Sequence, residues 1–126
     1  MLTISGSFSG FSVDDQAAAL AFYRDTLGLD VDDTGMGLEL KMPGGQHVFV
    51  YPKDDHKPAT FTVLNFEVAD IDAAVDELTA AGVTLARYEG MPQDEKGVLR
   101  GTAAAMGPDI AWFTDPAGNI LSVLNG

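Results

Sequence analysis

The 126-residue chain contains no cysteine and only two histidines, His47 and His56. The absence of cysteine excludes disulfide bonds, thiolate metal ligands and a cysteine nucleophile. The sequence also lacks a long apolar run, with or without a basic segment before it. We therefore expect neither a signal peptide nor a membrane-spanning helix, and we expect the protein to be cytoplasmic.

Positive charge is scarce as well. Seven lysines and arginines stand against 19 aspartates and glutamates, which gives a formal net charge of −12 at pH 7. A surface of that sign repels nucleic acid and anionic membranes and attracts cations, so we expect no nucleic-acid partner and no membrane partner. Two interpretations stay open: the acidic surface attracts a cationic ligand, or it only keeps the protein soluble in a salt-rich environment.

The sequence contains an internal repeat. Residues 11–20 (FSVDDQAAAL) match residues 66–75 (FEVADIDAAV) at five of ten positions. Each copy has the pattern of a strand end, an aspartate that can cap a helix, and an amphipathic helix closed by glycine. Two copies are too few for a solenoid, so the repeat predicts two equivalent modules that share one domain, at about 1–52 and 60–126.

Each module has the predicted element order strand-helix-strand-strand-strand. The order indicates an α+β fold, with the helices packed on one face of mostly antiparallel sheets. The predicted helices span about 16–27 and 71–81. The predicted strands span about 2–13, 29–32, 38–42, 47–51, 61–68, 83–88, 97–100, 110–114 and 120–124.

Three stretches identify a family. AFYRDTLGL (21–29), NFEVADIDAAVDELTAAGV (65–83) and AWFTDPAGNILSVL (111–124) closely resemble the vicinal oxygen chelate superfamily, which includes glyoxalase I, bleomycin-resistance proteins, fosfomycin-resistance enzymes and extradiol dioxygenases. The resemblance implies paired βαβββ modules that form a cup-shaped mixed or antiparallel sheet with helices on its outer face. It also implies a homodimer, and it says little about chemistry because one fold supports many functions.

Metal-dependent members of this superfamily bind a divalent ion with one histidine or carboxylate from each of four strands. Counting from the matched motifs places four residues at these positions: Phe8, Phe49, Val63 and Ser122. These side chains lack the imidazole nitrogen or carboxylate oxygen that such ions need. Shifting the count by two residues reaches His47 or Tyr51 on one strand and Asn65 on another, which is not a full set. We therefore expect no metal and no other cofactor.

Side chains that alternate along the strands share a face with these four positions. The expected ligand-binding residues on that face are Phe8, Ser12, Phe49, Val63, Asn65, Glu67 and Ser122. The glycine-rich segment 89–108 is either a lid, with Lys96 or Arg100 meeting an anionic group of the ligand, or a mobile surface loop. The residues expected on the shared face combine aromatic, aliphatic and a few polar groups, a mixture that is typical of a small-molecule pocket.

Three residues are candidates for catalysis. Glu67 could act as a general base or pair with a ligand cation, or it could be solvated near its strand end. His47 and Tyr51 lie on a strand of the first module and carry groups that can transfer a proton.

Two functions remain in competition. The first is a metal-free small-molecule binding protein of the glyoxalase and bleomycin-resistance type, which holds a ligand, cationic on the charge argument, in the cup of a homodimer. The second is an enzyme of the same superfamily, either a glyoxalase-like lyase or a metal-independent isomerase. The sequence leaves open whether the protein is an enzyme, and whether the modules pair within one chain or between two.

Overall fold

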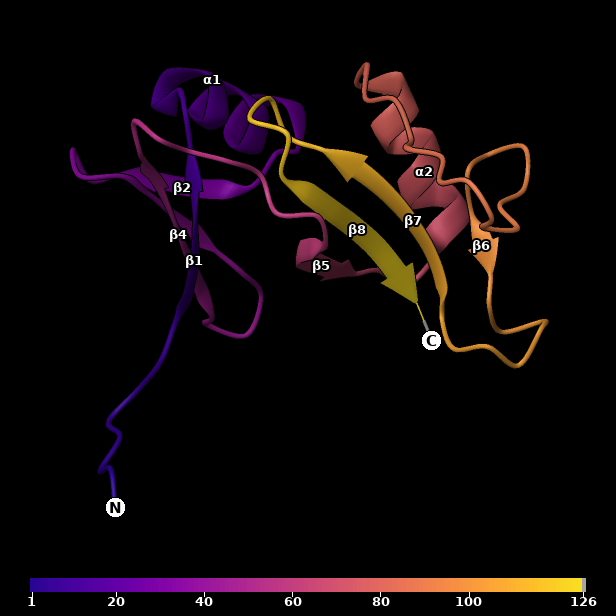
Figure 1. The fold of residues 1–126 in the computed structure, drawn as a ribbon, viewed down its shortest axis with the longest axis horizontal. Coiled ribbons are helices and arrows are strands. Elements are labelled where there is room, and N and C mark those ends of the chain that lie inside the picture. The colour runs from indigo at the N-terminus through magenta and orange to yellow at the C-terminus, as the bar shows by residue number, and fades with distance from the viewer. Residues whose placement is uncertain (126) are drawn as a thin grey trace. The chain divides into compact units, whose positions relative to one another are not determined.

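The computed structural model describes residues 1–125 and divides the chain into two compact units, Met1–Pro58 and Ala59–Gly126. Unit 1 contains β1 (Ser9–Val13), α1 (Gln16–Leu20), η1 (Ala21–Thr26), β2 (Asp30–Asp33), β3 (Leu38–Lys41) and β4 (His47–Pro52). Unit 2 contains β5 (Thr62–Glu67), α2 (Ile71–Ala80), β6 (Leu99–Arg100), β7 (Asp109–Thr114) and β8 (Ile120–Asn125) (Figure 1). The predicted α+β fold with two βαβββ modules is confirmed. That the two modules make a single domain stays a prediction.

The two units have the same sheet topology. Each has a mixed four-stranded sheet, in the order β1-β4-β3-β2 or β5-β8-β7-β6, and its first strand is parallel to its last. The register pairs Gly10 with Phe49 in unit 1 and Asn65 with Ser122 in unit 2. Gly10 and Asn65 are separated by the 55-residue period of the repeat, so Phe49 and Ser122 occupy equivalent places in the two sheets.

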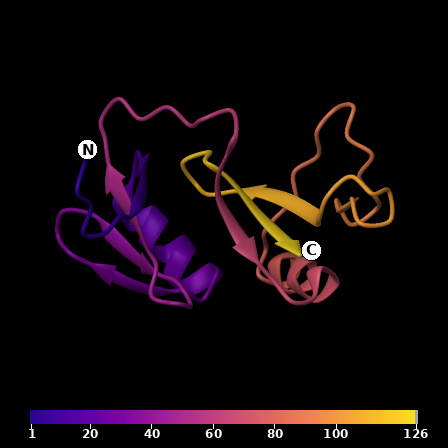
Figure 2. The ribbon, with the colours of Figure 1, turned by 90° about the horizontal axis from the view of Figure 1, so that it is seen from below.

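Each helix covers one face of its own sheet (Figure 2). In unit 1 the buried rings of Phe11 and Tyr23 lie 6.3 Å apart, between β1 and η1. In unit 2 the apolar face of α2 packs on β7 and β8. The buried apolar side chains that make this contact are Ile71, Val75, Leu78, Ala111, Phe113, Leu121 and Val123. We call the opposite face of each sheet its open face.

The first helix differs from the prediction in its hydrogen bonding. It begins at Gln16 as an α-helix but continues from Ala21 to Thr26 as a π-helix, and the Leu27 N–H donates to the Phe22 carbonyl at 2.9 Å. Gly28 follows with φ of +73°, as expected for a helix-closing glycine. None of the helices within residues 1–125 has the length and apolar character needed to cross a membrane.

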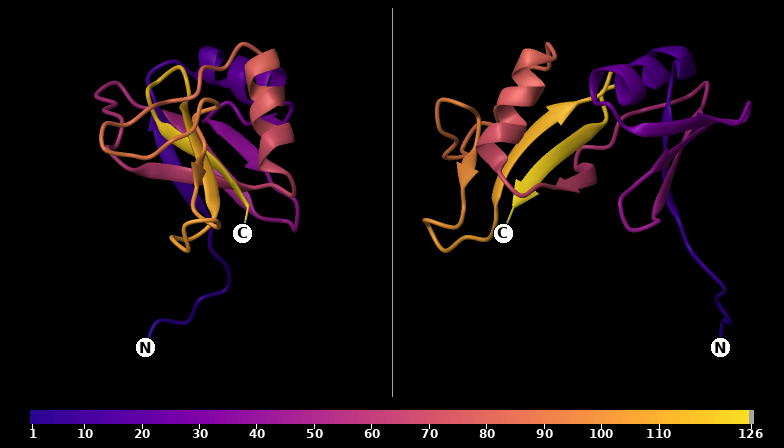
Figure 3. Two further views of the ribbon diagram at one scale, coloured as in Figure 1. Left: turned by 90° about the vertical axis from the view of Figure 1, so that its right-hand side faces the viewer. Right: turned by 180° about the vertical axis from the view of Figure 1, so that it is seen from behind.

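Two predicted strands are wrong in extent. The first strand begins only at Ser9, and residues 1–8 run away from β1 as extended chain (Figure 3). Its partner β4 begins at His47 and pairs with β1 from Val48 onward, so the sheet offers no strand to residues 2–8. Residues 83–88 form no regular strand either, because only Ala86 bridges to β7.

Candidate functional site

The open face of unit 1 carries a pair of stacked aromatic rings. Along β4, Val48 and Val50 are buried on the helix side, so the alternation sends Phe49 and Tyr51 to the open face. The centroids of these two rings lie 5.6 Å apart and the ring planes differ by 19°. The expectation that Phe49 and Tyr51 share a face is therefore met in their geometry.

Two glycines leave room for Phe49. A Cβ atom at Gly37 would lie 2.8 Å from Cζ of Phe49 and 2.8 Å from the carbonyl oxygen of Val50. A Cβ atom at Gly10 would lie 2.9 Å from the carbonyl oxygen of Phe49. The ring and backbone of Phe49 thus lie directly against neighbouring strands, and a side chain at either glycine would displace them.

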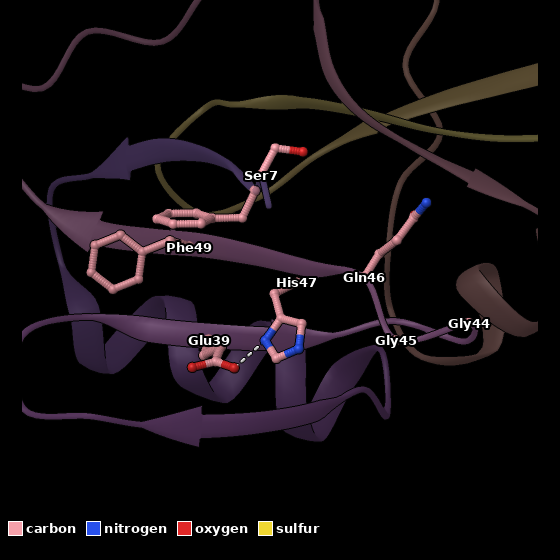
Figure 4. Close-up of a pocket in the computed structure, with 8 residues that line it drawn as sticks. Ser7, Glu39, Gly44, Gly45, Gln46, His47 and Phe49 are labelled. Atoms are coloured by element: carbon pink, nitrogen blue, oxygen red, sulfur yellow. Dashed lines mark hydrogen bonds and ion pairs between the residues drawn. The ribbon is translucent and has the colours of Figure 1, made fainter. Parts of the chain in front are cut away.

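A pocket of about 390 Å³ opens beside Phe49 (Figure 4). It is lined by Ser7, Phe8, Glu39, Gly44, Gly45, Gln46, His47 and Phe49. The apolar side chain of Phe8 is 73% exposed, so its ring is accessible from the pocket. The volume and the mixture of two phenyl rings with a few polar groups fit a small organic ligand.

The side chains of His47 and Glu39 are hydrogen-bonded to each other inside this pocket. Nδ1 of His47 lies within hydrogen-bond distance of Oε1 of Glu39, and the side chains are 48% and 32% exposed (Figure 4). Glu39 lies opposite Phe49 in the β3–β4 register. Sequence reasoning identified His47 but missed Glu39. The β3–β4 hairpin register was the signal that could have found it.

Other polar groups of unit 1 are engaged near the open face. The Ser12 hydroxyl and Nδ1 of His56 are hydrogen-bonded at 2.6 Å. This contact holds His56 against β1. Nζ of Lys41 lies 2.9 Å from Oδ2 of Asp32, and this hydrogen bond raises the pKa of Lys41. Lysine in this pair remains positively charged at neutral pH.

The open face of unit 2 has a hydrogen-bonded polar pair, of which one member is buried. Ser122 is fully buried, and its Oγ donates to Oδ1 of Asn65 at 2.6 Å. Trp112 lies opposite Ser122 on β7, and its Nε1 donates to Oγ1 of Thr62 at 3.2 Å. The ring of Tyr88 meets Trp112 edge-on at 5.6 Å, and burial raises the pKa of Tyr88.

The remaining candidates of unit 2 lie on β5. Glu67 is exposed and pairs in register with Leu124. Val63 is half-buried at a register shift between Thr62 and Leu64, which breaks the simple alternation on which its placement relied. The structure thus brings Asn65 and Ser122 together and leaves Glu67 open to water.

The four positions that the resemblance gives to metal ligands do not fit a metal ion. Phe8 and Phe49 supply phenyl rings, Val63 supplies an isopropyl group, and the Ser122 hydroxyl is already bonded to Asn65. Divalent ions in proteins need imidazole, carboxylate or carbonyl donors in sets of three or more. Within residues 1–125, no group of three or more histidine, aspartate or glutamate side chains is placed to hold one.

Arg100 lies on the helix side of the second sheet. In the β6–β7 register Arg100 pairs with Asp109. Asp109 points to the same face of β7 as the buried Phe113, which is the face that packs on α2. The guanidinium of Arg100 donates to both carboxylate oxygens of Asp72 at 3.0 and 2.8 Å, and Nε donates to Asp94 at 2.9 Å. The Arg100 hydrogen bonds lower the pKa of Asp72, and the Asp72 hydrogen bonds raise the pKa of Arg100. Arg100 therefore does not face the ligand positions of its own sheet.

A neighbouring lysine extends this cluster. Nζ of Lys96 lies 3.1 Å from Asp72 and 3.0 Å from Asp76, both on α2. The two ion pairs and the Arg100 contacts tie the segment around 94–100 to the helix. This part of the long 89–108 segment is attached to α2, on the side away from the open face.

Comparison with known proteins supports the same architecture. A family model for the glyoxalase/bleomycin resistance protein/dioxygenase superfamily matches residues 8–123. A superfamily member from Sphaerobacter thermophilus is 30% identical, with a TM-score of 0.70 over 99% of this chain and all of that one. No curated protein matches the chain.

Two more distant structures share the fold. TnmS3, an antibiotic binding protein from a Streptomyces species, is 22% identical with a TM-score of 0.69, covering 99% of this chain and 98% of its own. A lactoylglutathione lyase from Agrobacterium tumefaciens is 23% identical with a TM-score of 0.64, covering 98% and 95%. The family model spans most of this chain, so the chain belongs to the glyoxalase/bleomycin resistance protein/dioxygenase superfamily.

Proposed function

We propose that this protein binds a small aromatic molecule on the open face of unit 1 without the help of a metal ion. The observation that carries the proposal is the pocket beside Phe49, where Phe8 and Phe49 supply phenyl rings. The family resemblance implies that these are the positions of metal ligands in metal-dependent members. An aromatic guest can pack on these rings and on the adjacent Tyr51. Binding of this kind needs shape and apolar area but no catalytic group.

The two distant relatives show that one fold supports both binding and catalysis. One is described as an antibiotic binding protein and the other as a lyase. The side chains at the metal positions of this chain favour the binding function. Aromatic antibiotics are therefore suitable first candidates for the natural ligand.

We also propose that the ligand carries positive charge. The chain has a net charge of −12, and Asp32 and Glu39 lie on the strands of the open face beside a single lysine, Lys41. A cationic aromatic ring would gain Coulomb attraction as well as contact with the phenyl rings. We further propose that the open face of unit 2 offers a ligand-contacting surface of its own, and that the protein is a cytoplasmic homodimer. The unit 2 residues proposed for this surface are Val63, Asn65, Glu67 and Ser122.

The proposal is tested by fluorescence titration with 9-aminoacridine, a planar cation. We expect saturable binding that EDTA does not change, and weaker binding of the planar anion 9-anthracenecarboxylate. Phe49→Ala should weaken 9-aminoacridine binding at least tenfold, because a central aromatic anchor is lost. Phe61→Ala, which removes an exposed ring from the other unit, should have no effect. EDTA-sensitive binding, or equal binding by the two variants, would contradict the proposal.

An enzyme is the second candidate, and the His47–Glu39 pair is the observation that favours it. An imidazole held by a carboxylate can accept and return a proton when a substrate lies within reach. Turnover of S-lactoylglutathione that is lost in His47→Phe would establish this function. Binding of 9-aminoacridine without such turnover favours the first candidate.

A further inference from the structure

We propose that His47, oriented by Glu39, recognises a hydroxyl or N–H group on the aromatic ligand. Nε2 of the neutral imidazole accepts a hydrogen bond from that donor while the ring of the ligand packs on Phe49. The inference rests on the proposed function of the pocket, and it adds the chemical class of the ligand: an aromatic compound that carries a hydrogen-bond donor.

Glu39 fixes which ring nitrogen carries the proton. An ionised carboxylate can only accept hydrogen bonds, so Nδ1 of His47 must donate to Oε1 of Glu39. A neutral imidazole has one donor and one acceptor, and its second nitrogen, Nε2, is then the acceptor. Nε2 lies on the side of the ring away from Glu39 (Figure 4) and has no partner within residues 1–125.

The spacing along β4 suits a ligand that reaches both groups. His47 and Phe49 are two residues apart on one strand, so they share the open face and lie roughly 6.6 Å apart along the strand axis. A bicyclic aromatic ring spans that distance. Such a ligand can cover Phe49 with one ring and present a substituent on the other ring to His47.

Neither Lys41 nor the two glycines that line the pocket can take this role. Lys41 lies directly opposite His47 in the register, but an ammonium group can only donate, and it is paired with Asp32. Gly44 and Gly45 bring no side chain to the pocket. The imidazole therefore supplies an acceptor, with its tautomer set by Glu39.

The test compares 2-naphthol with 2-methoxynaphthalene, which has the same rings but no O–H donor. We expect the wild-type protein to bind 2-naphthol about five- to tenfold more tightly, as one net hydrogen bond provides. In His47→Phe the two compounds should bind equally, and both should still bind because Phe49 is kept. His47→Gln retains a side-chain oxygen acceptor and should keep part of the preference.

Two further variants examine the role of Glu39. In Glu39→Gln the amide can donate as well as accept, so the imidazole is no longer held in one tautomer and the preference should fall. Asp25→Asn removes the same charge from the exposed Arg24–Asp25 pair and should leave the preference unchanged. This control separates the orientation of His47 from a simple change in net charge.

The outcomes distinguish the inference from the function on which it rests. If the wild-type protein binds both naphthalenes equally, the donor recognition is overturned while the aromatic pocket stands. If the preference survives in His47→Phe, the role of His47 is overturned. If neither compound binds and 9-aminoacridine does not bind, the proposed function itself fails.

Discussion

Asp15 and Asp70 have the same backbone conformation, with φ of −138° and ψ of 105°, and they cap the two helices in the same way. Oδ1 of Asp15 accepts from the Ala18 N–H at 3.0 Å, and Oδ1 of Asp70 accepts from the Ala73 N–H at 3.1 Å. Each carboxylate satisfies a first-turn N–H group that has no partner inside the helix. The sequence repeat is thus a structural repeat down to its hydrogen bonds.

The two caps should contribute similarly to stability. Asp15→Ala and Asp70→Ala are each expected to lower the free energy of unfolding by about 1 kcal/mol, whereas the asparagine variants should lose less because their amide oxygen still accepts. Urea denaturation measures the change, and Asp14→Ala, beside the first cap, is the control. If the Asp14 and Asp15 variants are equally stable, the capping interpretation is wrong.

Gly37→Ala should affect both stability and ligand binding. The new Cβ would lie 2.8 Å from Cζ of Phe49 and 2.8 Å from the Val50 carbonyl oxygen, so the ring and the strand must both shift. Overpacking of this kind costs about 1–3 kcal/mol. We expect a lower urea midpoint and weaker 9-aminoacridine binding. Gly6→Ala is the control, because no atom lies within 4 Å of the new Cβ, and it should be as stable as the wild type. If Gly37→Ala is also as stable as the wild type and binds 9-aminoacridine equally well, the close packing around Phe49 is refuted.

The ion pairs of Asp72 predict a pH-dependent contribution to stability. Hydrogen bonds from Arg100 and then Lys96 lower the pKa of Asp72 in the folded protein, so folding favours its ionised form. That contribution is present above the unfolded pKa of about 3.9 and is lost as the pH falls toward the folded value. Asp72→Asn should therefore lower the urea midpoint at pH 7, and the difference from wild type should shrink below about pH 4.

The control for this experiment is Asp54→Asn, an aspartate of the other unit that makes the same change in net charge. It should change the urea midpoint little at either pH. High salt should also reduce the Asp72 effect, because this side chain is about half exposed at 49% and its ion pairs are screened. A difference that stays constant from pH 7 to pH 3 would mean that the ion pairs are not its cause.

Local signals predicted the parts of the fold that depend on neighbouring residues. The aspartate caps, the closing glycines and the strand alternation around Phe49 follow from sequence, because each involves residues a few positions apart. The first strand was predicted too long because its length depends on β4, whose start at His47 leaves residues 2–8 without a partner.

The candidate site shows the same division. His47 and Phe49 were found from one strand, but Glu39 lies on the neighbouring strand and is brought to His47 only by the hairpin register. Arg100 was expected near the ligand if the long, glycine-rich segment that carries it is a lid and not a mobile surface loop. Its position is set by the two-residue strand β6 and by Asp72 on a helix 28 residues earlier, which no local pattern reveals.

The hydrogen bond between Ser122 and Asn65 should respond unequally to loss of its two partners. Ser122 is fully buried, whereas Asn65 is exposed and can turn to water. Ser122→Ala should cost about 0.5–1.5 kcal/mol, the net value of one hydrogen bond. Asn65→Ala should cost about 1–3 kcal/mol, because it leaves a buried hydroxyl without its partner.

Urea denaturation of both single variants and the double variant tests this asymmetry. The double variant should be no less stable than Asn65→Ala alone, because removing the hydroxyl also removes the cost of leaving it unbonded. Ser5→Ala, in the exposed N-terminal segment, is the control for removal of a serine hydroxyl. If the two single variants cost the same and their costs simply add in the double variant, the two side chains do not interact.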